Sequence, residues 1–269
     1  MLNQASVTPF LKWAGGKRWL VRDHFDLFES METLRYIEPF LGSAAVFFAL
    51  APKVALLNDA NSDLIETYRT IRMSSKEVEA KLRRHHSSHS EEYFYAMRAS
   101  RPTSPSGRAA RFIYLNRTCF NGLYRVNRKG EFNVPIGTKT DVVLSTDDFD
   151  AIARALRDVE LTASDFEVVI DKACSGDFVF VDPPYTVKHN INGFIKYNER
   201  LFSWEDQERL KEALFRAANR GASILLTNAD HSSIRQLYKD CKIRTLERSS
   251  VMASESWRRR TTTEVLIYF

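Results

Sequence analysis

Two consecutive prolines, Pro183 and Pro184, follow the apolar run 177–181 and fix where that run must end. Neither proline can donate a backbone hydrogen bond, so a central strand cannot continue through them. The carbonyls of Asp182 and Pro183 and the Asp182 carboxylate can then face a ligand as acceptors, and Tyr185 adds a flat aromatic face. This set suits the exocyclic amino group of a planar base, although a Pro-Pro pair can also simply terminate a strand.

Short apolar segments alternate with helical segments in both the first sixty residues and the last hundred or so. Alternation of this kind predicts an open α/β sheet. We expect strands at 34–37, 53–57, 159–162, 178–181 and 223–226, helices at 44–50 and 204–220, and two late strands at 242–247 and 263–269 that close an antiparallel edge.

The middle of the chain has a different character. Residues 64–155 are helical in pattern and rich in Arg, Lys, Ser and His, which predicts a helical domain inserted between residues 1–63 and 156–269. The run His85-His86-Ser87-Ser88-His89 lies in this part without a nearby cysteine or a suitably spaced carboxylate. We expect a solvated helix end there, and no metal site.

Charge and cysteine content indicate what the protein binds and where in the cell it works. The net charge of +5 indicates an acidic partner, and the basic residues concentrate between Arg108 and Glu131, interleaved with aromatic residues. This mixture suits phosphate contact with base stacking, but it also suits a solvated surface hairpin. Three widely spaced cysteines, no apolar run of about 18 residues and no secretory signal predict a cytoplasmic protein without a membrane span.

Acidic residues stand where four expected strands end. In an open α/β sheet, ligands bind at the carboxyl ends of the strands, so acids gathered there indicate a shared site. An acid at the end of the second strand can accept hydrogen bonds from both ribose hydroxyls of a nucleoside, although an acid in that place more often caps a helix. The four acids are Glu38, Asp59, Asp165 and Asp182.

The N-terminal run 9–17 contains two adjacent glycines, Lys12, Trp13 and Lys17. It lacks the spacing and the Ser or Thr of a phosphate-binding P-loop. Paired glycines could let Trp13 and Lys17 fold over an anionic ligand, with the lysine meeting a carboxylate. Taken alone, the run favours an ordinary glycine-rich turn.

Four segments occur in a characteristic order: FLKWAGGK at 10–17, EPFLGSAAVFF at 38–48, ND at 58–59 and DPPY at 182–185. Together they resemble the Dam-type adenine-N6 DNA methyltransferases, the alpha group of the D12 class. Segments 114–125 and 130–135 resemble the DNA-probing hairpin of that family.

The resemblance implies a methyltransferase that depends on S-adenosylmethionine and is built on a Rossmann-like sheet. Its discontinuous catalytic domain would comprise residues 1–63 and 156–269, and a helical target-recognition domain carrying a β-hairpin would comprise residues 64–155. The resemblance also implies methyl transfer to N6 of a flipped adenine in duplex DNA, within GATC. The implied catalytic residues are Asp182, Pro183, Pro184 and Tyr185. The implied cofactor-binding residues are Trp13, Lys17, Glu38, Phe40, Asp59, Asp165, Phe166 and Asp182.

The family's DNA contacts fall on Lys12, Arg117, Phe120, Asn121, Leu123, Arg125 and Pro135 in this sequence. Two positions depart from the family pattern. Phe120 stands where many relatives carry a tyrosine that wedges into the base stack, and it keeps the ring without the hydroxyl. Ala44 replaces a glycine, which we expect to weaken cofactor binding at worst, provided that its φ is not positive.

Alternatives remain on the sequence alone. A methyltransferase of an RNA base or a protein amide could share the Asp-Pro-Pro-aromatic motif, and a DNA-binding relic could lack turnover. The basic aromatic hairpin favours duplex DNA, and intact Asp59, Asp182 and Tyr185 favour an enzyme. We expect a monomer that needs no obligatory protein partner and works in the cytoplasm, associated with the nucleoid through DNA.

Overall fold

The computed structural model describes residues 7–29, 33–127, 129–187, 202–249 and 261–269. The chain divides into two compact units, one made of residues 1–30 and 41–163 and the other of residues 31–40 and 164–269. The division predicted at residues 64 and 155 rests on composition and stays a prediction.

The strands of the described residues form a mixed seven-stranded sheet in the order β3-β2-β1-β4-β5-β7-β6. β2 pairs with β3, and β4 with both β1 and β5, in parallel, whereas β7 pairs antiparallel with β5 and β6. The predicted α/β sheet and its antiparallel edge are therefore confirmed. The strands are β1 Arg35–Glu38, β2 Ala55–Asn58, β3 Val159–Thr162, β4 Asp177–Val181, β5 Ser223–Ala229, β6 Lys242–Ser249 and β7 Thr261–Tyr268.

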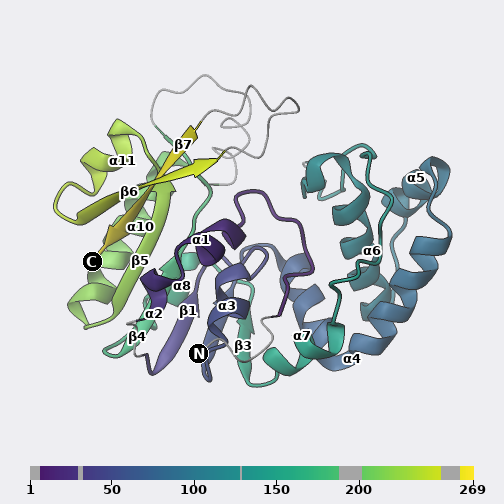
Figure 1. Cartoon of the computed structure of the whole chain (residues 1–269), viewed down its shortest axis with the longest axis horizontal. Coiled ribbons are helices and arrows are strands. Elements are labelled where there is room, and N and C mark those ends of the chain that lie inside the picture. The colour runs from purple at the N-terminus through teal and green to yellow at the C-terminus, as the bar shows by residue number, and fades with distance from the viewer. Residues whose placement is uncertain (1–6, 30–32, 128, 188–201, 250–260) are drawn as a thin grey trace. The chain divides into compact units, whose positions relative to one another are not determined.

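The second unit is built around β4 and β5. Every residue of β4 is buried, as expected for a central strand with both faces covered. Helix α10 (Trp204–Asn219) begins at a capping box of Ser203 and Asp206 and buries Leu210, Ala213, Leu214 and Ala217. Helix α10 also packs against α8 (Phe166–Ile170), and α11 (Ser232–Leu237) follows β5 (Figure 1).

The first unit is mostly helical, which confirms the predicted character of the middle of the chain; a separate inserted domain stays a prediction. The long helix α4 packs along α6, begins at the Asn61 N-cap and bends at Ser74, whose backbone leaves the helical region (Figure 1). The helices are α1 Arg18–Asp23, α2 Asp26–Glu29, α3 Ala45–Leu50, α4 Ser62–Ser87, α5 Glu91–Ala99, α6 Pro105–Thr118 and α7 Phe149–Ala155.

After α6 the chain folds back on itself. A short 3-10 helix, Phe120–Gly122, is followed by a hairpin-like segment with two antiparallel arms. Isolated β-bridges pair Cys119 with Ile136 and Val126 with Phe132. Reciprocal backbone bonds between 125–127 and 131–133 hold the two arms together. This segment coincides with the hairpin predicted from residues 114–125 and 130–135.

The histidine run occurs at the end of α4, as expected, but it is not simply solvated. His85 Nδ1 lies 2.7 Å from the Tyr93 hydroxyl, and His89 Nδ1 lies 2.9 Å from that of Tyr114. Burial lowers the pKa of His85 to about 4, so this ring is neutral at physiological pH. Within the described residues, no three His, Cys, Asp or Glu side chains gather as a metal ion would require.

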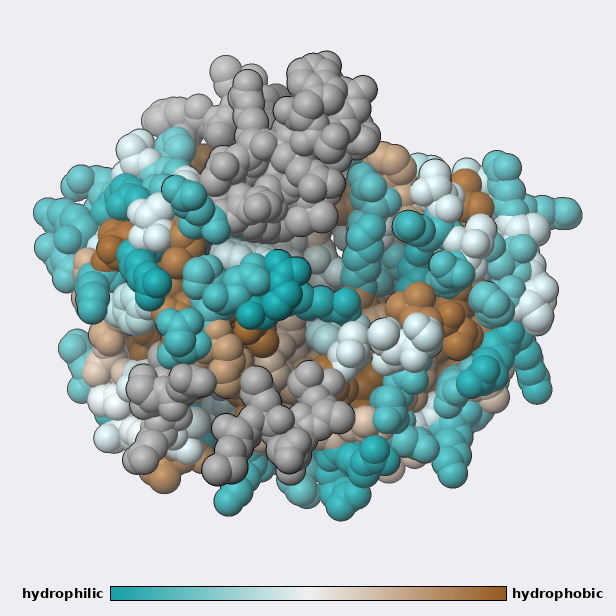
Figure 2. All heavy atoms as spheres, viewed as in Figure 1, coloured by the Kyte–Doolittle hydropathy of each residue, from teal (hydrophilic) through white to brown (hydrophobic). Residues whose placement is uncertain are grey.

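Hydrophilic side chains dominate the face shown in Figure 2, with hydrophobic side chains in smaller areas between them. Among the described residues, none of the helices combines the length and the apolar character needed to cross a membrane. The three cysteines are free.

Candidate active site

Asp182, Pro183, Pro184 and Tyr185 follow directly on β4, where the sequence predicted that the strand would end. Two side chains from neighbouring strands hold this corner. The Thr227 hydroxyl on β5 donates to Asp182 Oδ1 at 2.7 Å. The Tyr185 hydroxyl donates to Glu264 Oε2 on β7 at 2.7 Å. Residues 182–185, which form the corner after β4, are therefore held by partner side chains that are distant in the sequence.

The Tyr185 phenol stays protonated. Burial raises its pKa well above the ordinary value, and the nearby carboxylates of Asp182 and Glu264 raise it further, because a phenolate would face two negative charges. A protonated hydroxyl can keep donating to Glu264. Tyr185 is thus held as a neutral ring next to an acidic group.

At the end of β1, Glu38 is almost fully buried, and its Oε2 accepts a hydrogen bond of 2.9 Å from the Tyr36 hydroxyl. Phe40, two residues further on, stacks on Phe166 with ring centroids 5.5 Å apart. The centroid of the Phe202 ring lies 5.6 Å from that of Phe40 and 5.5 Å from that of Phe166. Three aromatic rings thus gather beside the end of β1, and they form an apolar surface suited to a flat heterocycle.

Asp165 is exposed and caps α8 by accepting from the Glu167 amide at 2.9 Å. Its neighbour Phe166 is buried in the aromatic group described above. Both predicted cofactor residues therefore sit at the start of one short helix. The capping role that the sequence left open for acids at strand ends is real for Asp165.

Asp59 directly follows β2, and both of its oxygens bind backbone amides. Oδ2 accepts from Gly42 at 3.0 Å and Oδ1 accepts from Asn61 at 2.9 Å. Each carboxylate oxygen can accept a second hydrogen bond, so the group can still bind two ligand hydroxyls. Burial raises the pKa of Asp59, and these two amides oppose the shift by stabilising the charge.

The glycine loop that follows β1 is shaped by Trp13. Gly42 has φ +47°, and a Cβ there would lie 2.7 Å from the Trp13 ring. The Gly42 carbonyl accepts from the buried Tyr68 hydroxyl at 3.0 Å. The Lys17 side chain is buried, and its Nζ donates to the Gly15 carbonyl at 2.8 Å. Gly42, Trp13 and Asp59 therefore belong to one connected loop structure.

The backbone conformation of Ala44 contradicts one expectation. Tolerance of alanine was predicted on condition that its φ is not positive, yet Ala44 has φ 56° and ψ 32°, in the left-handed region. Alanine is strained in that region by about 1–2 kcal/mol, because its Cβ approaches the following carbonyl oxygen. Glycine adopts this backbone conformation without the same strain.

Most of the predicted DNA-contacting residues gather at the hairpin. The Lys12 stem lies over Gly122, and its backbone exchanges hydrogen bonds with the Asn116 amide. Phe120 is 52% exposed, which is unusual for a large apolar ring. Arg125 is exposed and its Nε donates to Asn133 Oδ1 at 2.8 Å. Of the remaining three, Asn121 and Pro135 are exposed and Leu123 is half-buried.

Arg117 does not fit the predicted DNA contact. Its guanidinium is buried, forms an ion pair with Asp147 at 2.6 Å, and donates to the carbonyls of Phe10 and Val142. All five N–H groups are used inside the protein, so a phosphate would have to displace one of them. Arg117 instead ties α6 to the N-terminal segment and to the loop before α7.

Sequence reasoning missed four residues that hold the predicted ones. Thr227 and Glu264 hold Asp182 and Tyr185, Phe202 completes the aromatic group, and Arg209 bonds Asp165. A buried acid within an apolar strand is a signal that could have indicated Glu264. The other three carry no local signal, because their partners come from distant parts of the chain.

Comparisons with known sequences agree on one family. A family model described as D12 class N6 adenine-specific DNA methyltransferase matches residues 13–252. The chain is 35% identical to the type II methyltransferase M1.LlaDCHI of Lactococcus lactis subsp. cremoris, covering 98% of this chain and 96% of the relative. It is 34% identical to the type II methyltransferase M.MjaIII of Methanocaldococcus jannaschii, covering 83% and 84%. It is 29% identical to the DNA adenine methylase of Escherichia coli (strain K12), covering 97% and 94%.

Proposed function

The chain belongs to the D12 class of N6 adenine-specific DNA methyltransferases, and we propose that it methylates an adenine flipped out of duplex DNA within GATC. The observation that carries the proposal is the corner after β4, where Thr227 holds Asp182 and Glu264 holds Tyr185. An acceptor group beside a neutral aromatic ring suits an amino group on a planar base. Positioning of this kind is a large part of catalysis when no covalent intermediate forms.

In the proposed reaction, the Asp182 carboxylate and the Pro183 carbonyl accept the two protons of the adenine amino group. Two acceptors favour a pyramidal nitrogen, which exposes its lone pair for in-line attack. Tyr185 stacks on the base and keeps it in plane. Bound S-adenosylmethionine would supply the methyl group to this nitrogen and leave as a neutral thioether, and the surplus amino proton would pass to the Asp182 carboxylate, which already accepts from the amino group.

When bound, S-adenosylmethionine supplies an activated methyl group on a sulfonium. The residues present fit such a ligand. In the first unit, Asp59 offers a carboxylate to the ribose hydroxyls, and we assign Trp13 and Lys17 to the same ligand. In the second unit, Phe40 and Phe166 offer aromatic faces to the adenine ring. We also assign Glu38, Asp165 and Asp182 to cofactor binding.

For DNA, we assign contacts to Lys12, Phe120, Asn121, Leu123, Arg125 and Pro135. The exposure of the Phe120 ring supports a wedge that enters the base stack, because an apolar ring on the surface is available to insert between bases. Arg125 can pair bidentately with a guanine edge, and Asn133 already restrains its Nε. We propose that the protein acts as a monomer in the cytoplasm, without an obligatory protein partner.

The proposal is tested by methyl transfer from labelled S-adenosylmethionine to two duplexes that differ only in whether they contain GATC. We expect label in the GATC duplex and little in the other. Equal label in both would reject the GATC assignment while leaving the chemistry intact. Label in neither duplex, while RNA or protein in a parallel reaction is labelled, would reject a DNA substrate.

A further inference from the structure

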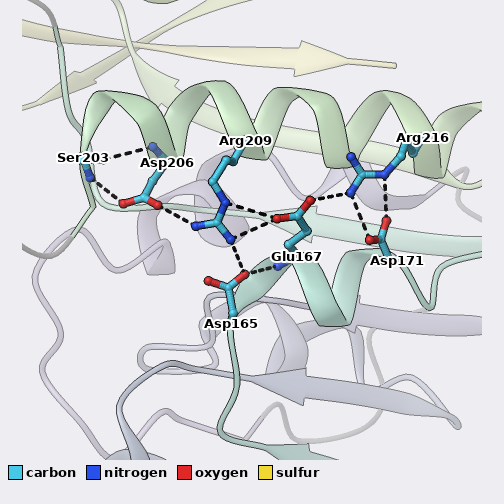
Figure 3. Close-up of polar contacts among 7 residues, drawn as sticks. All are labelled: Asp165, Glu167, Asp171, Ser203, Asp206, Arg209 and Arg216. Atoms are coloured by element: carbon cyan, nitrogen blue, oxygen red, sulfur yellow. Dashed lines mark hydrogen bonds and ion pairs between the residues drawn. The ribbon is translucent and has the colours of Figure 1, made fainter.

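Arg209 on α10 bonds three acidic residues at once, as Figure 3 shows. Its Nη2 donates to Asp165 Oδ1 at 2.9 Å and to Glu167 Oε2 at 3.0 Å. Its Nη1 donates to Asp206 Oδ1 at 2.8 Å. The same guanidinium lies 4.9 Å from the centre of the Phe166 ring, within the range of a cation–π contact.

These contacts fix how Asp165 presents its carboxylate. Oδ1 accepts both the Glu167 amide, at 2.9 Å, and Arg209. No hydrogen bond to Oδ2 comes from the described residues of the chain. One oxygen is therefore used to orient the group, and the other remains able to accept from a ligand donor, such as an amino group on a heterocycle.

Phe166 is oriented from the same side. The guanidinium lies near the Phe166 ring, and that ring stacks on Phe40 at 5.5 Å. A planar cation over a ring restricts how the ring can tilt, because the contact is best over the face. Arg209 therefore restrains both an acceptor and an aromatic surface.

We propose that Arg209 is a positioning residue for the cofactor site, acting on S-adenosylmethionine through Asp165 and Phe166. The inference rests on the proposed function, which assigns those two residues to the cofactor. Groups that hold the cofactor in the ground state and in the transition state alike change its KM and leave kcat unchanged. Arg209 should therefore control affinity and not the transfer step.

The chain supplies a matched control in Arg216. It lies two turns further along α10 and bonds Glu167 Oε1 at 2.7 Å and Asp171 at 3.0 Å, as Figure 3 shows. Its side chain is 42% exposed, against 43% for Arg209. The two arginines thus take part in the same ion-pair ladder between α8 and α10, but only Arg209 contacts Asp165 and Phe166.

The experiment compares Arg209→Ala, Arg216→Ala and the wild type by calorimetric titration with S-adenosylmethionine, steady-state kinetics and thermal unfolding. We expect Arg209→Ala to raise Kd and KM for the cofactor by roughly three- to tenfold, in the lower part of the range for residues coupled in one hydrogen-bonded network, with kcat within about twofold. Arg216→Ala should leave Kd, KM and kcat near their wild-type values. Equal effects of the two substitutions, or an unchanged Kd for Arg209→Ala, would overturn the inference.

A double-mutant cycle with Asp165→Ala, which removes the oxygen that accepts from Arg209, tests the route. If Arg209 acts through Asp165, adding Arg209→Ala to Asp165→Ala should raise Kd by much less than it does in the wild type. Full additivity would overturn the route through Asp165. Failure of the wild type itself to bind S-adenosylmethionine would instead reject the proposed function, so the two failures are distinguishable.

Discussion

The hydroxyl of Tyr185 donates a hydrogen bond of 2.7 Å to Glu264, a buried acid on β7 that lies 79 residues further along the chain. The bond joins the residue proposed to stack on the target base to the antiparallel edge of the sheet. It fixes the ring without placing a positive charge beside it.

Removing this hydroxyl should slow the reaction without preventing folding. We expect Tyr185→Phe to lower kcat about tenfold, the rate equivalent of one lost hydrogen bond, because the ring can stack but is no longer anchored. Glu264→Gln, which keeps an acceptor for the hydroxyl, should lose less. Single-turnover rates check both, and a Tyr185→Phe variant at the wild-type rate would show that the anchor is irrelevant.

Thr227 should matter through its hydroxyl alone. Thr227→Val preserves the shape of the side chain but removes the donor to Asp182 Oδ1, so we expect kcat to fall roughly three- to tenfold. Thr227→Ser keeps the hydroxyl and should stay near wild type. Rates with saturating DNA and cofactor measure the effect, and similar rates for the valine and serine variants would contradict it.

Ala44 should tolerate glycine better than its helical neighbour does. At φ 56°, alanine is strained, so Ala44→Gly should leave the free energy of unfolding unchanged or raise it by up to about 1 kcal/mol. Ala45→Gly, at the start of α3, should lower it by about 0.5–1 kcal/mol. Denaturant unfolding compares the two, and an equal loss in both would rule out the strain.

Arg125 should control one base pair of the target. We expect Arg125→Ala to lose about 1–3 kcal/mol of discrimination at that position, measured as kcat/KM on duplexes with single substitutions. Arg83→Ala provides the control, since this exposed arginine on α4 pairs with Glu79 away from the hairpin. An unchanged preference in the Arg125 variant would remove it from base reading.

Much of the fold follows from local patterns. The strand before Asp182 and the helix 204–219 were predictable because prolines and a capping serine mark their limits, and apolar spacing marks their faces. The residue ranges differ from the predicted ones by only a few residues at either end.

The support of the site could not be predicted in the same way. Thr227 reaches Asp182 because β5 pairs with β4, and Glu264 reaches Tyr185 because β7 pairs with β5; no local spacing encodes these long-range pairings. Arg117 lies in a basic, aromatic-rich segment that suggested a DNA contact, yet an aspartate thirty residues later neutralises it inside the protein. Charge in a sequence does not tell which cations are paired.

The most direct measurement identifies the modified nucleoside. Duplex DNA incubated with the protein and S-adenosylmethionine is digested to nucleosides and analysed by mass spectrometry, beside an Asp182→Ala variant whose DNA binding is checked separately. We expect N6-methyldeoxyadenosine with the wild type and none with the variant, although the variant still binds DNA. Methylation on another base, no methylated adenine with the wild type, or near wild-type turnover by the variant would contradict it.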